Sequence, residues 1–365
     1  MGKALIATDL PLHFEEVTPE WLTGALSATF PGVKVATAIR DRDRFGTAAS
    51  ARFELTYADR AGHADLPDSV HVKGGFDDKW RKRVWQALHQ EVRFYADIAP
   101  HVTLNIPKCY FHGLNDAPQG VLVLEDLTRR GVRFGMNLAP VSADDVAAAL
   151  EQIARMHADW WESPRLSAMT GCGEPQRIYL KWQFRPKHWE ELITRKHGKL
   201  ITQALVDSGT GVRALEKLWE IMDARPSTFL HGDPHGGNLF YERDGRPGFL
   251  DWQMCFAGNH VHDASWIIVT TFTVEQRRKY ERDMLRHYLA ALKACRGEAP
   301  DFDETWLLYR QNMAHACSSY GAAPADADKQ AIVEGAAERV FNAAVDHDVL
   351  ESLGLKSRAT ARAAL

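Results

Sequence analysis

The chain has 365 residues, 45% hydrophobic and 25% charged, and 44 basic against 48 acidic side chains give a formal net charge of −4. This length predicts two domains, and the balance of apolar and charged residues is that of a globular protein, not a disordered one. A near-neutral chain lacks the basic surface that non-specific nucleic-acid binding needs. The five cysteines are scattered without a C-x-x-C pair, which argues against a disulfide framework or a cysteine-rich zinc site.

The apolar stretches predict a soluble, cytoplasmic protein with no membrane partner. The first twelve residues hold one lysine and no long apolar core, unlike a secretory signal. The most apolar stretch, residues 264–273, is far shorter than the roughly 20 residues that cross a bilayer. The few unpaired cysteines fit a reducing compartment.

The first 125 residues are predicted to form a sheet with one crossing helix. Thr18 and Pro19 indicate a helix start, as N-cap and first helical residue. Between Ala51 and Tyr57 apolar and polar residues alternate, which is typical of a half-buried strand. We also expect a short strand at 69–73, a helix at 79–98 before Pro100, and a buried strand at 121–124.

After Leu127 the pattern is mainly helical. Ser142 with two following acids predicts a helix start. Residues 227–251 contain short strands and turns, and helical patterns follow at about 275–295, 303–320 and 327–350. A sheet-rich part followed by a helical part predicts an α+β protein in two lobes, residues 1–126 and 127–365.

The most informative segment is His231-Gly-Asp233-Pro-His235-Gly-Gly-Asn238. Two short strands, 239–241 and 248–250, follow it and are separated by the turn signal Asp244-Gly245. A hairpin brings its open ends together, so Asn238 and Asp251 are expected side by side. Their oxygens suit Mg²⁺, and Asp233 is placed to orient a hydroxyl and accept its proton.

The pattern H-G-D-x-x-x-x-N followed by apolar-apolar-D-W resembles the aminoglycoside phosphotransferase and choline kinase superfamily, whose fold is similar to that of protein kinases. Val123-Leu-Glu-Asp-Leu127 and Met156-His-Ala158 are similar to motifs of its ecdysteroid-kinase-like branch. The resemblance covers about residues 40–270. It implies a bilobal fold with a small antiparallel-sheet N-lobe that binds nucleotide and a larger helical C-lobe.

The resemblance also assigns roles in the C-lobe. It implies that Asp233 is the catalytic base and that His231 supports the catalytic loop. Asn238 and Asp251 would hold Mg²⁺, and Asp263 would support the loop from behind. The implied activity is ATP- and Mg²⁺-dependent phosphorylation of a hydroxyl group on a small molecule, with ATP and Mg²⁺ as cofactors.

In the N-lobe the resemblance implies a nucleotide site. Lys73 would contact the α- and β-phosphates and Glu91 would pair with it. The backbone of Glu125, Asp126 and Leu127 would bind adenine as a hinge. Where protein kinases have G-x-G-x-x-G, residues 45–50 hold one glycine, and Gly46, Thr47 and Ser50 are the residues implied there.

Two alternatives to a kinase follow from the residues. One is a His/Asp metal-dependent hydrolase, because histidines and aspartates cluster in the sequence at metal-ligand spacings: His231, Asp233, His235, His260, His262 and Asp263. The other is a non-catalytic nucleotide-binding scaffold. His157 is expected to be a hydrogen-bonded core histidine, and His235 either fills the loop or faces substrate. The tryptophans are expected in the core: Trp160, Trp161, Trp252 and Trp266.

The acceptor is predicted from charge. Residues 177–199 hold seven basic side chains against two glutamates, with four aromatic residues among them. If this stretch lines the acceptor cleft, a polycationic aminoglycoside is disfavoured; the alternative is an amphipathic helix with a solvated basic face.

Overall fold

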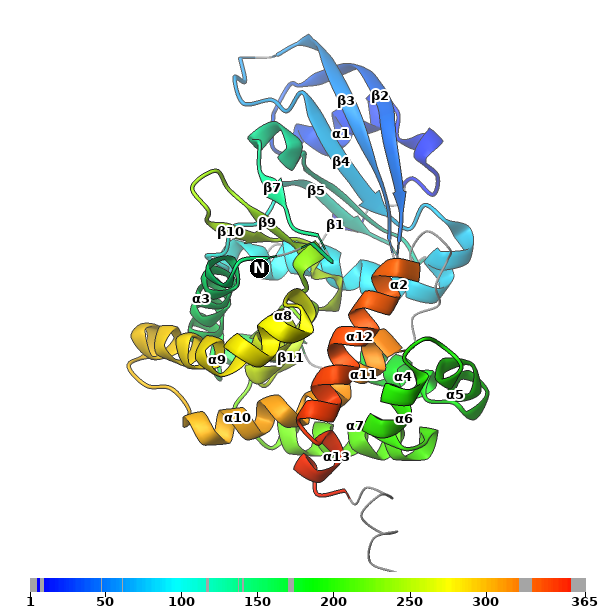
Figure 1. Ribbon diagram of the computed structural model, residues 1–365. Helices are drawn as coiled ribbons and strands as arrows, with labels where there is room; N and C mark the ends of the chain where they lie inside the picture. Colours follow the sequence, from blue (N-terminus) through cyan, green and yellow to red (C-terminus); the bar gives the residue numbers. More distant parts are fainter. Residues whose placement is uncertain are drawn as a thin grey trace, which may run out of the picture. The chain divides into compact units, whose positions relative to one another are not determined.

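The computed structural model describes residues 5–6, 10–46, 48–60, 62–115, 118–136, 138–139, 141–169, 174–321 and 330–355 (Figure 1). The chain forms two compact units. Unit 1 comprises Met1–Arg133 and Phe249–Cys255, and unit 2 comprises Phe134–Gly248 and Phe256–Leu365.

Unit 1 is built on a six-stranded sheet in the order β1-β5-β6-β4-β3-β2. β1 runs parallel to β5, and the other neighbours are antiparallel. The predicted alternation holds in β3, where Ala51, Phe53 and Leu55 are buried in the core. The strands are β1 (Leu5–Ile6), β2 (Lys34–Phe45), β3 (Ala49–Asp59), β4 (Ser69–Gly74), β5 (Cys109–Leu114) and β6 (Gly120–Glu125).

The helices of unit 1 begin where the sequence indicates. The Thr18 side chain accepts a hydrogen bond from the Trp21 N–H and caps α1 (Pro19–Ser27). The helix predicted at 79–98 consists of α2 (Asp78–Arg93) and a π-helical turn, η2 (Phe94–Ile98), which ends before Pro100. Short 3-10 helices complete the unit: η1 (Phe14–Glu16), η3 (Ala99–His101) and η4 (Leu127–Arg130).

Unit 2 is mainly helical, and its centre is α8 (Val261–Thr271), in which every residue is buried. α8 packs against α3 (Ala143–Trp160), which Ser142 caps as predicted, and against α9 (Val274–Arg296). The pattern at 303–320 is interrupted at Asn312, which separates α10 (Phe302–Gln311) from α11 (Met313–Gly321). The remaining helices are η5 (Pro164–Met169), α4 (Glu174–Gln183), α5 (Pro186–Ile193), α6 (Gly198–Leu205), α7 (Ser208–Asp223), α12 (Gln330–Asp346) and α13 (Val349–Ser352).

The short strands predicted at 227–251 frame the H-G-D segment. β8 (Thr228–Leu230) precedes it and pairs antiparallel with β11 (Phe256–Gly258). After 3-10 helix η6 (Gly236–Asn238), β9 (Leu239–Tyr241) and β10 (Pro247–Phe249) form the expected hairpin, with Gly245 in the left-handed conformation at φ 85°. These two strands form a sheet with β7 (Arg133–Phe134) in the order β10-β9-β7.

The α+β class is confirmed. The compact units first divide after Arg133, and the lobe boundary predicted at residue 126 stays a prediction. The Asp126 side chain accepts from the Thr128 N–H and caps η4, and Arg130 pairs with Glu125 at 3.1 Å. Residues 127–133 belong to unit 1. The chain also returns to unit 1 at Phe249–Cys255, which a single sequence boundary does not capture.

Candidate active site

Lys73 lies between two carboxylates in unit 1. Its Nζ is 2.7 Å from Glu91 Oε2 on α2 and 2.8 Å from Asp251 Oδ1. The Glu91 side chain is 3% exposed and that of Asp251 is 31% exposed. Burial alone would lower the pKa of Lys73, but the two carboxylates outweigh it and raise the pKa, so the ammonium group stays charged.

Asp251 is held next to Lys73 by the segment Phe249–Cys255. The Trp252 ring stacks on Phe94 of η2 at 4.0 Å between ring centroids, and the backbone N–H of Trp252 donates to Glu91 Oε1 at 3.3 Å. Asp251 itself has φ 64°, a backbone conformation that costs energy in a non-glycine residue and persists where its surroundings impose it. Packing of the next residue therefore positions the carboxylate at the lysine.

The H-G-D loop lies in unit 2 and is folded on itself around Asn238. The Asn238 Nδ2 donates to the Asp233 carbonyl oxygen at 2.9 Å, and its backbone N–H donates to the His235 carbonyl at 2.8 Å. The Asp233 N–H donates to Nδ1 of the fully buried His231 at 3.3 Å. His231 and Asn238 thus hold the backbone of the loop from both sides of Asp233.

One turn of α8 anchors this loop from behind. The Asp263 carboxylate accepts from the His231 N–H at 2.7 Å and from the Gly232 N–H at 3.0 Å. His262 Nε2 donates to the Gly232 carbonyl at 3.0 Å. Burial alone would raise the pKa of Asp263, but the hydrogen bond with His157 and the nearby imidazoles outweigh it and keep the pKa below its ordinary value.

His157 extends the anchor into α3 and α9. Its Nε2 lies 3.3 Å from Asp263 Oδ2, and its Nδ1 lies 2.8 Å from the Tyr288 hydroxyl, which in turn lies 3.2 Å from His260 Nδ1. All four side chains are buried. The expected hydrogen-bonded core histidine therefore belongs to a chain of contacts that ends at the H-G-D loop.

Trp266 makes a contact with Asp233 that the sequence did not predict. Its indole Nε1 donates to Asp233 Oδ1 at 2.8 Å, while the ring is 3% exposed. The expectation of a core residue is correct for the ring but not for its polar edge. The signal available in the sequence was the spacing Asp263–Trp266, because residues three apart lie on one face of a helix.

Comparison with known proteins identifies the family. Residues 80–300 match the sequence model of the phosphotransferase enzyme family. This chain belongs to that family. Lys73 lies seven residues before the matched range, and the glycine-poor loop at 45–50 lies about 30 residues before it. No curated protein is similar enough in sequence to count as a match.

Solved structures of kinases and phosphotransferases are similar in fold. A microcompartment-associated aminopropanol kinase is 14% identical with a TM-score of 0.50, covering 92% of this chain and 99% of that chain. A GDP complex of aminoglycoside 2'-phosphotransferase-IIIa is 13% identical with a TM-score of 0.47, covering 90% and 99%. A choline kinase from Streptococcus pneumoniae is 12% identical with a TM-score of 0.45, covering 90% and 98%.

Identities this low bear on the fold, and the aminopropanol kinase supports the predicted protein-kinase-like architecture. The predicted superfamily is confirmed, and the chain is a small-molecule phosphotransferase by family. The ecdysteroid-kinase-like branch stays a prediction.

The predicted adenine hinge has a structural role of its own. The Glu125 N–H already donates to the Lys108 carbonyl at 2.8 Å, and Leu127 is buried. The Asp126 carboxylate accepts from Arg52 at 2.7 Å and from Ser69 at 2.6 Å. Burial would raise the pKa of Asp126, but hydrogen bonds from surrounding side chains outweigh it and hold the pKa far below its ordinary value; the donors are His71, Ser69, Thr128 and Arg52.

The glycine-poor loop connects β2 and β3. Gly46 donates its N–H to the Ala48 carbonyl at 3.2 Å, and Thr47 lies outside the described residues. Ser50 pairs in register with Lys73 across β3 and β4. Gly46 also borders a hollow of about 130 Å³ that Gly74 and Gly75, the residues after Lys73, line as well.

The metal-hydrolase alternative lacks its geometry. Among the described residues, no three His, Cys, Asp or Glu side chains come together in an arrangement that could hold a metal ion. His262 and His157 instead make the hydrogen bonds given above. Burial lowers the pKa of His262, and it lowers the pKa of His260 to about 3, so both rings are neutral near pH 7.

The donor set predicted for Mg²⁺ fits that ion chemically. Asp251 supplies a carboxylate whose Oδ2 accepts from Gln253 at 3.1 Å and whose Oδ1 faces Lys73. Asn238 uses its NH₂ on the Asp233 carbonyl, which leaves the amide oxygen as its ligand atom. Two oxygen donors with waters and phosphates completing the shell is the usual protein contribution to Mg²⁺.

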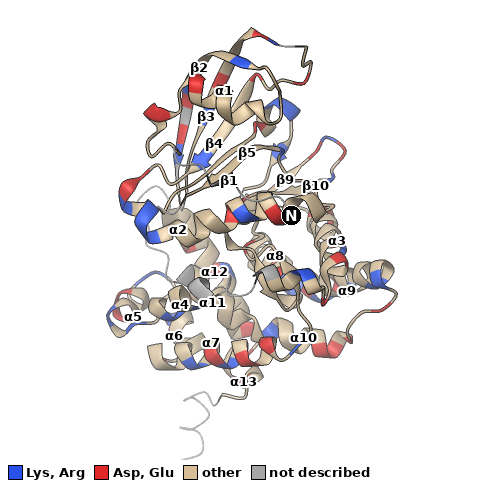
Figure 2. Cartoon of the chain, turned by 180° about the vertical axis from the view of Figure 1, so that it is seen from behind, with Lys and Arg blue, Asp and Glu red and all other residues tan. Residues whose placement is uncertain are grey.

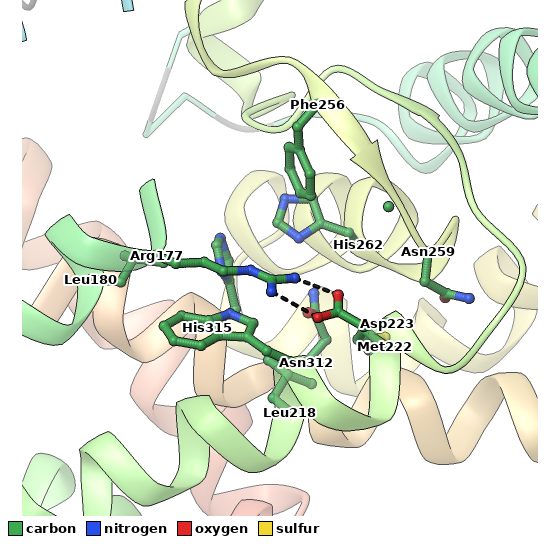
Figure 3. Close-up of a pocket in the computed structure, with 12 residues that line it drawn as sticks. Arg177, Leu180, Leu218, Met222, Asp223, Phe256, Asn259, His262, Asn312 and His315 are labelled. Carbon is green, nitrogen blue, oxygen red and sulfur yellow. Dashed lines mark hydrogen bonds and ion pairs between the residues drawn. The ribbon is translucent and has the colours of Figure 1, made fainter. Parts of the chain in front are cut away.

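The basic stretch predicted near the acceptor is partly neutralised within unit 2. Arg177 pairs with Asp223 at 2.7 Å and Lys181 with Glu216 at 2.6 Å. The Arg177–Asp223 pair crosses a cavity that His262 and His315 also line (Figure 3). Basic and acidic residues are interspersed over the surface helices of unit 2 (Figure 2). The positive charge of 177–199 is therefore a weaker argument against cationic acceptors than the sequence alone indicates.

None of the helices in the described part of the chain is both long and apolar enough to cross a bilayer. Its four described cysteines are free thiols: Cys109, Cys255, Cys295 and Cys317.

Proposed function

We propose that this protein is a cytoplasmic ATP- and magnesium-dependent kinase that phosphorylates a hydroxyl group of a small molecule. The observation that supports this best is the catalytic loop. Asp233 accepts a hydrogen bond at its backbone carbonyl, donates one from its backbone N–H and accepts another at one carboxylate oxygen. This arrangement suits a base that must meet a hydroxyl in one orientation.

Each candidate site residue has a separate proposed role. Asp233 orients the acceptor hydroxyl and takes its proton as the oxygen attacks the γ-phosphorus. Lys73, kept charged by Glu91, contacts the nucleotide phosphates, and the 125–127 segment contacts the adenine. Asn238 and Asp251 hold Mg²⁺, which when bound neutralises phosphate charge.

The surface beside the loop favours an acceptor with an apolar part. Phe134, Met136 and Leu138 are 42%, 66% and 37% exposed, although all three are large apolar residues. Their segment lies against the loop, because Gly135 donates its N–H to the Leu239 carbonyl at 2.8 Å. A Cβ atom at Gly135 would lie 2.0 Å from the Gly236 carbonyl oxygen, so only glycine allows this approach. We therefore propose a neutral or partly apolar alcohol in preference to a polycation.

The test is a nucleotide-consumption screen with magnesium over hydroxylated compounds, using ATP and GTP in parallel. Aminoglycosides, macrolides, choline-like alcohols, sterols and aromatic alcohols cover the candidate classes. Turnover of a hydroxyl compound that stops on chelating magnesium is the expected result. Binding of ATP with no turnover of any compound would favour the scaffold alternative, and efficient aminoglycoside turnover would refute the acceptor argument.

The Asp233→Asn variant tests the base. Its amide keeps the shape of the carboxylate but cannot accept the proton, so kcat should fall by roughly 10²–10⁴-fold. ATP affinity, measured by calorimetry, should stay within about twofold of wild type. A variant that turns over at the wild-type rate would refute the assignment.

A further inference from the structure

The side chain that contacts the catalytic carboxylate from α8 is a neutral tryptophan. The same helical turn supplies Asp263 to the loop backbone and Trp266 to the Asp233 carboxylate. We propose that Trp266 is a positioning residue that holds the Asp233 carboxylate through Oδ1 in the orientation in which it receives the acceptor proton. This inference rests on the function proposed above.

The indole is suited to this role because its N–H only donates. Trp has one donor and no acceptor, and it does not exchange its proton with a carboxylate near neutral pH. A 2.8 Å hydrogen bond to an ionised oxygen is a strong, directional contact that opposes rotation of the carboxylate. Oδ1 therefore keeps its donor throughout the reaction.

His235 lies on the other side of the same carboxylate. Its Nδ1 accepts from the Gly237 N–H at 3.0 Å, so a neutral His235 carries its proton on Nε2. That nitrogen lies 3.7 Å from Asp233 Oδ2. The two oxygens are thus distinguished by their surroundings: Oδ1 faces a buried indole, and Oδ2 faces the partly exposed ring of His235.

The proton transfer uses the carboxylate that Trp266 holds. The O–H bond of the acceptor breaks and its proton goes to the carboxylate of Asp233. The acceptor oxygen bonds to the γ-phosphorus while the bond between that phosphorus and the ADP oxygen breaks. The products are ADP and the phosphorylated acceptor, and Asp233 later releases the proton to water.

Packing fixes the indole. Its ring lies parallel to that of His262 at 6.1 Å between centroids, and His315 meets it edge-on at 5.2 Å. Burial lowers the pKa of both histidines, so both rings are neutral. His262 also donates to the Gly232 carbonyl, which ties the indole's stacking partner to the loop that it serves.

The test is Trp266→Phe, which keeps an apolar ring and removes the donor. A loosened carboxylate should lower kcat by about 10- to 100-fold, while KM for ATP changes by less than about twofold. Trp160→Phe is the matched control, because Trp160 is equally buried in unit 2 and packs on Phe229. The control should keep wild-type kcat.

Three results would overturn the proposal: an unchanged kcat for Trp266→Phe, a loss confined to KM, or the same kcat loss in both variants. If Trp266→Phe unfolds at a lower temperature than the control, Trp266 is replaced by benzothienylalanine, in which sulfur takes the place of the indole N–H. Wild-type kcat in that isosteric variant would also overturn the proposal. Asp233→Asn is measured alongside: if it is inactive while Trp266→Phe is not impaired, the proposed function stands and only this inference fails.

Discussion

The two units hold their functional groups by different physical means. In unit 1, the ammonium group of Lys73 lies between the carboxylates of Glu91 and Asp251. In unit 2, the H-G-D loop is held by hydrogen bonds from one turn of α8, where burial lowers the pKa of His262. Ionic contacts therefore hold the lysine of unit 1 in place, whereas hydrogen bonds hold the loop of unit 2 that carries Asp233.

The largest effect in this comparison is expected from removing the hydrogen bonds by which Asp263 on α8 holds the H-G-D loop of unit 2. In Asp263→Asn an NH₂ group replaces one of two oxygens that accept backbone N–H groups, leaving a buried donor unpaired. The free energy of unfolding should fall by about 3 kcal/mol, and kcat should fall by more than about 100-fold. Chemical denaturation and steady-state kinetics measure both.

Asp283→Asn on α9 is the control, because that carboxylate is 73% exposed and makes only a surface pair with Arg286. Wild-type stability in Asp263→Asn would show that the hydrogen bonds of Asp263 do not hold the loop.

A smaller effect is expected from removing the cation of unit 1. Lys73→Met leaves Glu91 and Asp251 facing each other without a cation, and kcat/KM for ATP should fall by about 100-fold. Glu91→Gln should lose part of the same transition-state stabilisation that Lys73→Met loses. The two substitutions should therefore couple by about 1–2 kcal/mol in a double-mutant cycle. Lys82→Met on the exposed side of α2 is the control. Strict additivity would mean that the pair does not act as a unit.

The smallest effect concerns how the free energy of unfolding depends on pH. It tests whether Asp126 in unit 1 stabilises the fold through its charge. The folded-state pKa of Asp126 lies below its unfolded value of about 3.9, so its contribution to stability is complete above that pH and is lost as pH falls below about 4. Asp126→Asn should lower the free energy of unfolding by about 2 kcal/mol at pH 7 and less at pH 3.

Denaturation curves at pH 7, 5, 4 and 3 measure this difference. Asp41→Asn removes a half-exposed partner of the same Arg52 and serves as the control. A destabilisation that does not shrink toward pH 3 would place the effect of Asp126 in packing and not in its charge.

The sequence predicted helices and strands well where a capping side chain or an alternation of apolar and polar residues marks them. Thr18 and Ser142 begin their helices as expected, and the hairpin around Gly245 forms as its turn residues indicate. The break at Asn312 and the π-helical turn at Phe94 were not predictable, because tertiary packing and not propensity decides where such interruptions fall. The lobe boundary at residue 126 stays a prediction.

The sequence by itself determined the family, the α+β class and the residues of the H-G-D loop, because a spaced set of chemically distinct residues carries that information locally. It also predicted that Lys73 and Glu91 pair. Only the tertiary structure decided that Asp251 joins that pair in unit 1 and that Trp266 reaches the Asp233 carboxylate. Both contacts join residues distant in the chain, 178 residues apart for Lys73 and Asp251 and 33 for Asp233 and Trp266, and such proximity depends on how helices and strands pack.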